Sequence, residues 1–143
     1  MKLLNNIQQK LKAPKGQRNS FGNYNYRSCE DILTAVKPLL EEGVLLLTDE
    51  VVDCGGRVFL RATATLKSTE LHSESSVDVE VTAVGLAEIP TQRKGMDASQ
   101  ITGCASSYAR KYALNGLFCI DDTKDADTDE QANQTNNNQE GAW

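Results

Sequence analysis

Residues 57–86, RVFLRATATLKSTELHSESSVDVEVTAVGL, decide the fold because apolar and polar side chains alternate along both halves of this stretch. In the first half the apolar positions are Val58, Leu60, Ala62, Ala64 and Leu66. In the second half they are Val77, Val79, Val81 and Ala83. Alternation with a period of two is typical of a strand that buries one face. The pattern predicts two paired strands, at residues 57–67 and 76–86.

A third strand is expected just before this pair. Residues 44–52, VLLLTDEVV, form a short apolar run, and Asp53-Cys54-Gly55-Gly56 has the composition of a tight turn. The connections are too short to hold crossover helices, so the three strands should form an antiparallel meander. One face of that sheet is apolar and requires a helical cover.

Helical patterns flank the sheet on both sides. Residues 2–12 carry leucine and isoleucine at helical spacing. Ser28 and Asp31 form a variant capping box that begins a second helix, which Pro38 should kink or shorten. A third helix, residues 98–114, should begin at Asp97 or Ser99 and end at Asn115-Gly116, with Ile101, Ala105, Tyr108 and Tyr112 packed in the core. The predicted class is α+β, a three-stranded meander packed by helices.

Charge is strongly segregated along the chain. Of the total charge of −5, residues 121–143 carry −6, since seven acidic residues face one lysine, which leaves +1 for residues 1–120. Residues 1–27 contain six cations and no acid. We therefore predict a folded domain at residues 1–120 that binds DNA and oligomerises, and a disordered acidic tail at 121–143.

Several chemistries lack the residues that they need. The chain has no GxxxxGK[ST] loop for ATP, no CxxC pair and one histidine, His72. No cofactor, metal site or catalytic residue is predicted, and the protein is not expected to be an enzyme. Asp49, Glu50 and Asp53 keep one alternative open, a Mg²⁺-dependent nuclease. No apolar run is long enough to span a membrane, and the first residues do not resemble a secretory signal, so a cytoplasmic protein is expected.

Cations and aromatic rings are interleaved in the loop at residues 15–27, which should have no regular structure. Lys15, Arg18 and Arg27 surround Phe21, Tyr24 and Tyr26. A single DNA strand offers phosphates to cations and base faces to rings. The alternative is that the rings anchor the loop to the core.

Two further groups of cations are candidates for DNA contact. Arg110 and Lys111 project from the last helix, and Arg93 and Lys94 precede it in the loop at residues 88–97. Arg57, Arg61 and Lys67 share the polar face of one strand. Ordinary solvated surface is the alternative for the helix, and cross-strand pairing with Asp78 or Glu80 is the alternative for the strand.

Two stretches, SFGNYNYRSCEDILTAVKPLL (residues 20–40) and MDASQITGCASSYARKYALNGLFCIDD (residues 96–122), resemble the phage essential recombination function (Erf) family of single-strand annealing proteins. Residues 106–114, SSYARKYAL, look like the signature helix of that family. The resemblance covers residues 1–122. It implies a core similar to that of the eukaryotic single-strand annealing proteins, and assembly into a homo-oligomeric ring or helical filament.

The resemblance also implies a function and DNA contacts. Members bind single-stranded DNA and anneal complementary strands without ATP during phage or prophage recombination. Carried over to this chain, Arg110 and Lys111 touch the DNA backbone, and Arg57 and Arg61 line the same groove. Apart from the resemblance, the composition of the acidic tail suggests that it competes with DNA for the basic groove or presents Trp143 to a replication or recombination partner, and a solubilising appendage is the alternative. A strand-coating protein without annealing activity and a protein-binding adaptor remain alternatives.

Overall fold

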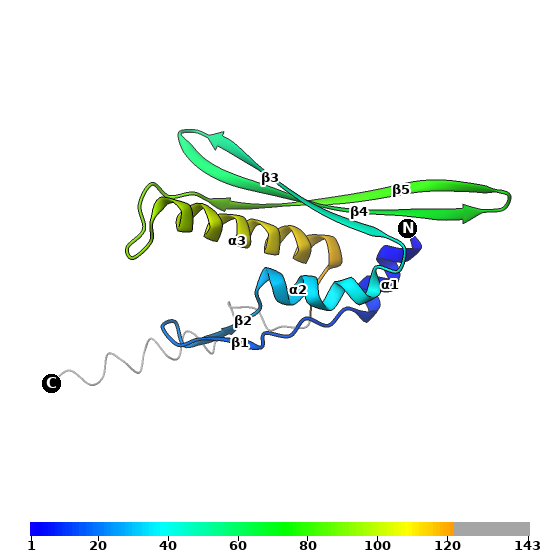
Figure 1. Ribbon diagram of the computed structural model, residues 1–143, viewed down its shortest axis with the longest axis horizontal. Coiled ribbons are helices and arrows are strands. Elements are labelled where there is room, and N and C mark those ends of the chain that lie inside the picture. Colours follow the sequence, from blue (N-terminus) through cyan, green and yellow to red (C-terminus); the bar gives the residue numbers. More distant parts are fainter. Residues whose placement is uncertain (122–143) are drawn as a thin grey trace.

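The computed structural model describes residues 1–121 and confirms the α+β class with an antiparallel three-stranded sheet (Figure 1). The elements in chain order are α1 Lys2–Lys10, β1 Gln17–Asn19, β2 Tyr24–Tyr26, α2 Cys29–Val36, the 3-10 helix η1 Lys37–Leu39, β3 Val44–Cys54, β4 Arg57–His72, β5 Ser75–Glu88 and α3 Ala98–Phe118. Most of the acidic segment 121–143 lies outside the described residues, and so does the expectation of disorder there.

The sheet is the predicted meander, in the order β3-β4-β5. Its register places Leu47 opposite Ala64, and Ala64 opposite Ala83. Gly55 and Gly56 both have positive φ, of 63° and 82°, which is the conformation that a tight hairpin between β3 and β4 requires. The hairpin of β4 and β5 is longer than the alternating pattern indicated and extends past the start of β3.

One long helix, α3, lies along the inner face of the sheet (Figure 1). Small side chains make this contact close. A Cβ atom on Gly85 of β5 would lie 2.1 Å from the carbonyl oxygen of Ala109 and 2.5 Å from the backbone nitrogen of Ala113. Ala62 and Ala64 of β4 are fully buried in the same layer. The helix and the sheet therefore meet almost backbone to backbone.

The two shorter helices cover the other side of α3 (Figure 1). Ile7 of α1 and Ile32 and Val36 of α2 are fully buried in one core cluster with Leu114 and Phe118 of α3. The predicted capping box of α2 is confirmed, since the Ser28 hydroxyl accepts from the Asp31 backbone N–H at 3.1 Å. Pro38 shortens the helix, and the chain continues as η1.

Two further sequence-based expectations were wrong. Residues 15–27 are not an irregular loop, because β1 and β2 pair as a short antiparallel hairpin. Helix α3 does not stop at Asn115-Gly116, because it continues to Phe118 and ends at Cys119, which has a left-handed φ of 49°. Burial of Leu117 and Phe118 outweighs the helix-ending tendency of glycine.

Between residues 1 and 121, none of the helices combines the length and the apolar character that a membrane crossing needs.

Candidate nucleic-acid interface

The short hairpin and the last helix enclose a shallow groove, which we call the hairpin–helix groove. It is lined by Tyr26, Arg27, Ser28, Cys29, Ser107, Tyr108 and Lys111. The capping box fixes one wall, because it sets the point where the chain leaves β2 and enters α2. Helix α3, packed on the sheet, provides the other wall. Residues from the two stretches richest in cations and aromatic rings thus meet in one place.

Lys111 stands at the centre of the groove. Its ammonium nitrogen lies 4.5 Å from the ring centre of Tyr108 and 5.9 Å from that of Tyr112. Both are cation–π distances. Burial lowers the pKa of Lys111, and the positive charges of Arg27 and Lys15 lower the pKa further. Positively charged groups from three separate segments therefore lie near one another at this end of the groove.

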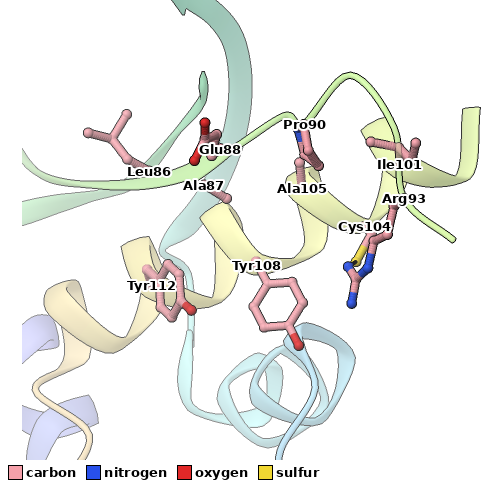
Figure 2. Close-up of a pocket in the computed structure, with 10 residues that line it drawn as sticks. All are labelled: Leu86, Ala87, Glu88, Pro90, Arg93, Ile101, Cys104, Ala105, Tyr108 and Tyr112. Carbon is pink, nitrogen blue, oxygen red and sulfur yellow. Dashed lines mark hydrogen bonds between the residues drawn. The ribbon is translucent and has the colours of Figure 1, made fainter. Parts of the chain in front are cut away.

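The expectation that Tyr108 and Tyr112 pack in the core was wrong. Their side chains are 38% and 47% exposed, and their ring centres lie 6.1 Å apart along the outside of α3. Figure 2 shows the two rings side by side along α3, lining a hollow with Leu86, Ala87 and Glu88 of β5. The buried stripe continues from Ala105 to Ala109 and Ala113 instead. The four-residue spacing of these alanines was the signal in the sequence.

Arg27 differs from a surface cation because its side chain is buried and hydrogen-bonded to the backbone. It is 5% exposed, and its guanidinium donates to the carbonyl oxygen of Ala13 at 2.7 Å. This bond ties the end of β2 to the segment that leads into β1. Lys15, in that same segment, is partly buried. Arg27 thus supplies positive charge to the groove while also bracing the hairpin.

The hairpin carries the remaining residues predicted in the first stretch. Arg18 of β1 is exposed and donates to Asn25 at 3.1 Å and also to Asn23. Tyr24 and Tyr26 stand edge to face, with ring centres 6.2 Å apart. The hydroxyl of Tyr24 lies close enough to Tyr108 to affect the pKa of that phenol, which burial raises most. The aromatic surface therefore runs from the hairpin onto α3.

Arg110 projects from α3 towards the edge strand β3 and does not line the groove. Its Nε donates to Oδ1 of Asp49 on β3 at 3.0 Å, and its Nη2 lies 3.0 Å from Oδ2. Ser106 donates to the same carboxylate at 2.6 Å. Arg110 and its neighbour Lys111 thus occupy different surroundings, and the structure brings only Lys111 into the groove.

Arg57, Arg61 and Lys67 lie on the outer face of the sheet, which no helix among residues 1–121 covers (Figure 1). Each cation pairs with an acid on a neighbouring strand: Arg57 with Glu88, Arg61 with Glu50, and Lys67 with Glu80 at 3.1 Å. Cross-strand pairing is therefore present, although of the two partners expected, Asp78 and Glu80, only Glu80 takes part, and DNA contact by this row stays a prediction. The pairs leave this face nearly neutral and far from the hairpin–helix groove.

Arg93 and Lys94 are exposed in the loop before α3. Arg93 reaches back to the helix, where its Nη1 donates to the sulfur of Cys104 at 3.4 Å. It lines a second hollow together with Pro90, Tyr108 and Tyr112 (Figure 2). Arg93 therefore extends the aromatic surface of α3 at the end opposite to α2. Within residues 1–121, Lys94 makes no hydrogen bond or ion pair.

The three acids that kept a nuclease open do not converge. Asp49 and Glu50 are adjacent in β3, so they project to opposite faces, toward Arg110 and Arg61 respectively. Asp53 accepts from the backbone N–H of Gly56 within the turn. Within residues 1–121, no group of three or more His, Cys, Asp or Glu side chains is arranged to hold a metal ion.

Together these features define a small α+β domain whose last helix and N-terminal hairpin share a basic, aromatic groove. The chain belongs to the ERF superfamily, whose family model matches residues 1–142. It is 54% identical over 131 residues to the essential recombination function protein of Salmonella phage P22. That match covers 91% of this chain and 60% of the phage P22 protein, so the chain spans well under two thirds of its relative. No solved structure matches the chain, and the likeness to the eukaryotic annealing core stays a prediction.

Proposed function

We propose that this protein binds single-stranded DNA in the hairpin–helix groove and anneals complementary strands without ATP, as part of phage recombination. The observation that carries the proposal is the placement of Lys111 over two exposed tyrosine rings, with Arg27 and Lys15 nearby. Cations beside exposed rings match a strand that offers phosphates and unpaired bases together. Family membership and the name of the phage P22 relative support a role in recombination.

Annealing needs no catalytic group, because each stacked base-pair step releases about 1–2 kcal/mol. The obstacles are phosphate repulsion, self-structure in each strand and the search for register. A groove with a few cations lowers the repulsion while holding the strand weakly enough to release it. Oligomerisation would repeat such weak sites and raise the total affinity without strengthening any one of them. A ring or filament is therefore part of the proposal.

The proposal gives the predicted contact residues unequal weight. Lys111, Lys15, Tyr24, Tyr26 and Arg93 lie along the groove or its aromatic extension. Arg27 contributes charge from a buried position. By contrast, Arg110, Arg57 and Arg61 already pair with carboxylates, so a phosphate would have to compete with those acids. Contacts from these three arginines remain a prediction.

The deciding experiment is a fluorescence assay with two complementary oligonucleotides that carry a donor and an acceptor dye. We expect the protein to accelerate pairing without ATP or Mg²⁺, and Lys111→Ala to abolish the acceleration. Binding without faster pairing would support the strand-coating alternative. Shortened products that appear only with Mg²⁺ would support the nuclease. If the protein did not bind single strands even at low salt, the protein-binding adaptor would be the remaining alternative.

A further inference from the structure

The tip of the β1–β2 hairpin displays one aromatic ring to solvent. The side chain of Phe21 is fully exposed. The residues around it in the loop are Asn19, Ser20, Gly22 and Asn23. Protein-binding patches gather several apolar side chains. A single ring surrounded by polar groups instead suits a partner whose flat faces lie between charged groups, as the bases of a DNA strand do.

The backbone of the tip is braced by Asn19. Its side-chain oxygen accepts hydrogen bonds from the backbone N–H groups of Phe21 and Gly22, each at 3.0 Å. Its side-chain nitrogen donates to the hydroxyl of Tyr24 at 2.9 Å. One side chain thus fixes the backbone that bears Phe21 and connects it to the next ring.

Further contacts hold the turn from its other side. Arg18 bridges Asn23 and Asn25 across the hairpin, and Asn23 takes the left-handed φ of 53° that closes the loop. The ring of Tyr24 rests on the backbone of Gly22, since a Cβ atom built there would lie 2.3 Å from Cε1 of Tyr24. A tip ordered in advance loses little conformational entropy when its ring is buried by a partner.

We propose that Phe21 is a wedge that inserts between two neighbouring bases of the strand held in the hairpin–helix groove. The inference rests on the proposed function and adds the position where the strand is unstacked. Tyr24 lies on Gly22 beside the wedge and stands edge to face with Tyr26, which lines the groove together with Tyr108, so the rings lead from the tip towards the groove. Insertion of an apolar side chain opens a base step, and stacking on a ring accepts any base.

The test places a fluorescent reporter at the tip of the full-length chain. Phe21→Trp is made together with Trp143→Phe, so that one tryptophan remains in the protein. The probes are an oligothymidylate and an abasic sugar-phosphate strand of equal length, and anisotropy of a label on each strand reports binding. We expect the oligothymidylate to quench the tryptophan by stacking, and the abasic strand to bind without quenching.

Each other outcome has a defined meaning. Binding of the oligothymidylate without quenching, or equal quenching by both strands, overturns the wedge and leaves the proposed function intact. If neither strand binds, the proposed function is overturned and the wedge with it. A fluorescence change that follows protein concentration alone, with no further change on adding DNA, assigns Phe21 to contact with a second copy and also overturns the wedge.

An affinity comparison provides an independent check. Phe21→Ala should weaken binding of the oligothymidylate roughly five- to 150-fold, the range for loss of one stacked ring. Affinity for the abasic strand should not change. Leu71→Ala is the matched control, because Leu71 is an apolar side chain that is 80% exposed at the far end of the β4–β5 hairpin. Equal effects of the two variants, or equal losses on both strands, would contradict the wedge.

Discussion

The Nε of Arg110 on α3 donates one bifurcated hydrogen bond to the two carboxylate oxygens of Asp49 on β3, at 3.0 and 3.2 Å, across 61 positions of sequence. The pair joins an edge strand to the helix that covers the sheet. Burial alone would raise the pKa of Asp49, but hydrogen bonds from Arg110 and Ser106 and the positive charge of Arg110 lower it below its usual value. Arg110 therefore has a structural partner, whichever ligand α3 binds.

This pair should make the stability of the fold depend on pH. A carboxyl with a lowered folded-state pKa stabilises the fold above its unfolded pKa, and the stabilisation disappears as the pH falls below about 4. Asp49→Asn should lower the free energy of unfolding by about 1 kcal/mol at pH 7 and flatten the loss of stability in acid. Urea unfolding at pH 7 and pH 3 tests this. Glu50→Gln, which removes the exposed partner of Arg61, is the control and should change stability less.

Salt dependence separates the groove from the outer face of the sheet. Lys111→Ala should reduce the slope of log affinity against log salt for single-stranded DNA by about one, because one phosphate contact is lost. The double variant Arg57→Ala, Arg61→Ala should leave the slope close to that of the unaltered protein, because both arginines are paired with glutamates. Fluorescence anisotropy titrations at several salt concentrations measure both. A larger change in the double variant would move the interface to the sheet.

Alkaline pH should weaken DNA binding through Lys111. Burial and the nearby Arg27 and Lys15 lower the pKa of this lysine, so it loses its charge at a lower pH than an exposed lysine. Since a phosphate binds the charged form, affinity should fall as the pH rises towards about 10. Lys111→Arg keeps its charge throughout this range and should resist the fall. Parallel curves for the two proteins would contradict the role assigned to Lys111.

Two glycines provide a matched test of the contact between helix and sheet. Gly85→Ala places a methyl group against backbone atoms of Ala109 and Ala113 and should destabilise the fold by about 3 kcal/mol or more. Gly103→Ala, on an open side of α3, meets nothing within 4 Å and should stabilise the fold by about 0.5–1 kcal/mol. Thermal unfolding followed by circular dichroism measures both. If the two substitutions shifted the melting temperature in the same direction, the close approach at Gly85 would be refuted.

The sheet was predictable because its signal is local and repeated. Every second residue of β4 from Leu60 to Leu66 is apolar and buried, so register and inner face follow from the sequence. The cap of α2 at Ser28 was predictable for the same reason. The end of α3 was not, because burial of Phe118 depends on partners distant in sequence. Helix boundaries follow tertiary packing when a weak glycine signal opposes it.

The groove was predictable only in part. The sequence indicated which stretches carry cations and rings, but not that Arg27 and Lys111 would meet, since 84 positions separate them. Tyr108 and Tyr112 were assigned to the core because large rings weigh more than alanines in a hydrophobic pattern. The structure gives the buried positions to Ala109 and Ala113, because only small side chains permit the close approach at Gly85.

The contact at Gly85 makes the two walls of the groove unequal. At Gly85 the backbones of β5 and α3 meet closely, and α3 packs along the sheet on both sides of this point, so we expect this wall of the groove to be the stiffer one. The facing wall is the β1–β2 hairpin, whose two strands have three residues each. It is anchored at its base by the hydrogen bond from Arg27 to the carbonyl oxygen of Ala13. We therefore expect a bulkier ligand to be accommodated by displacement of the β1–β2 hairpin. Because the hairpin bears Phe21, the position of this ring relative to the groove would then change with the size of the bound ligand.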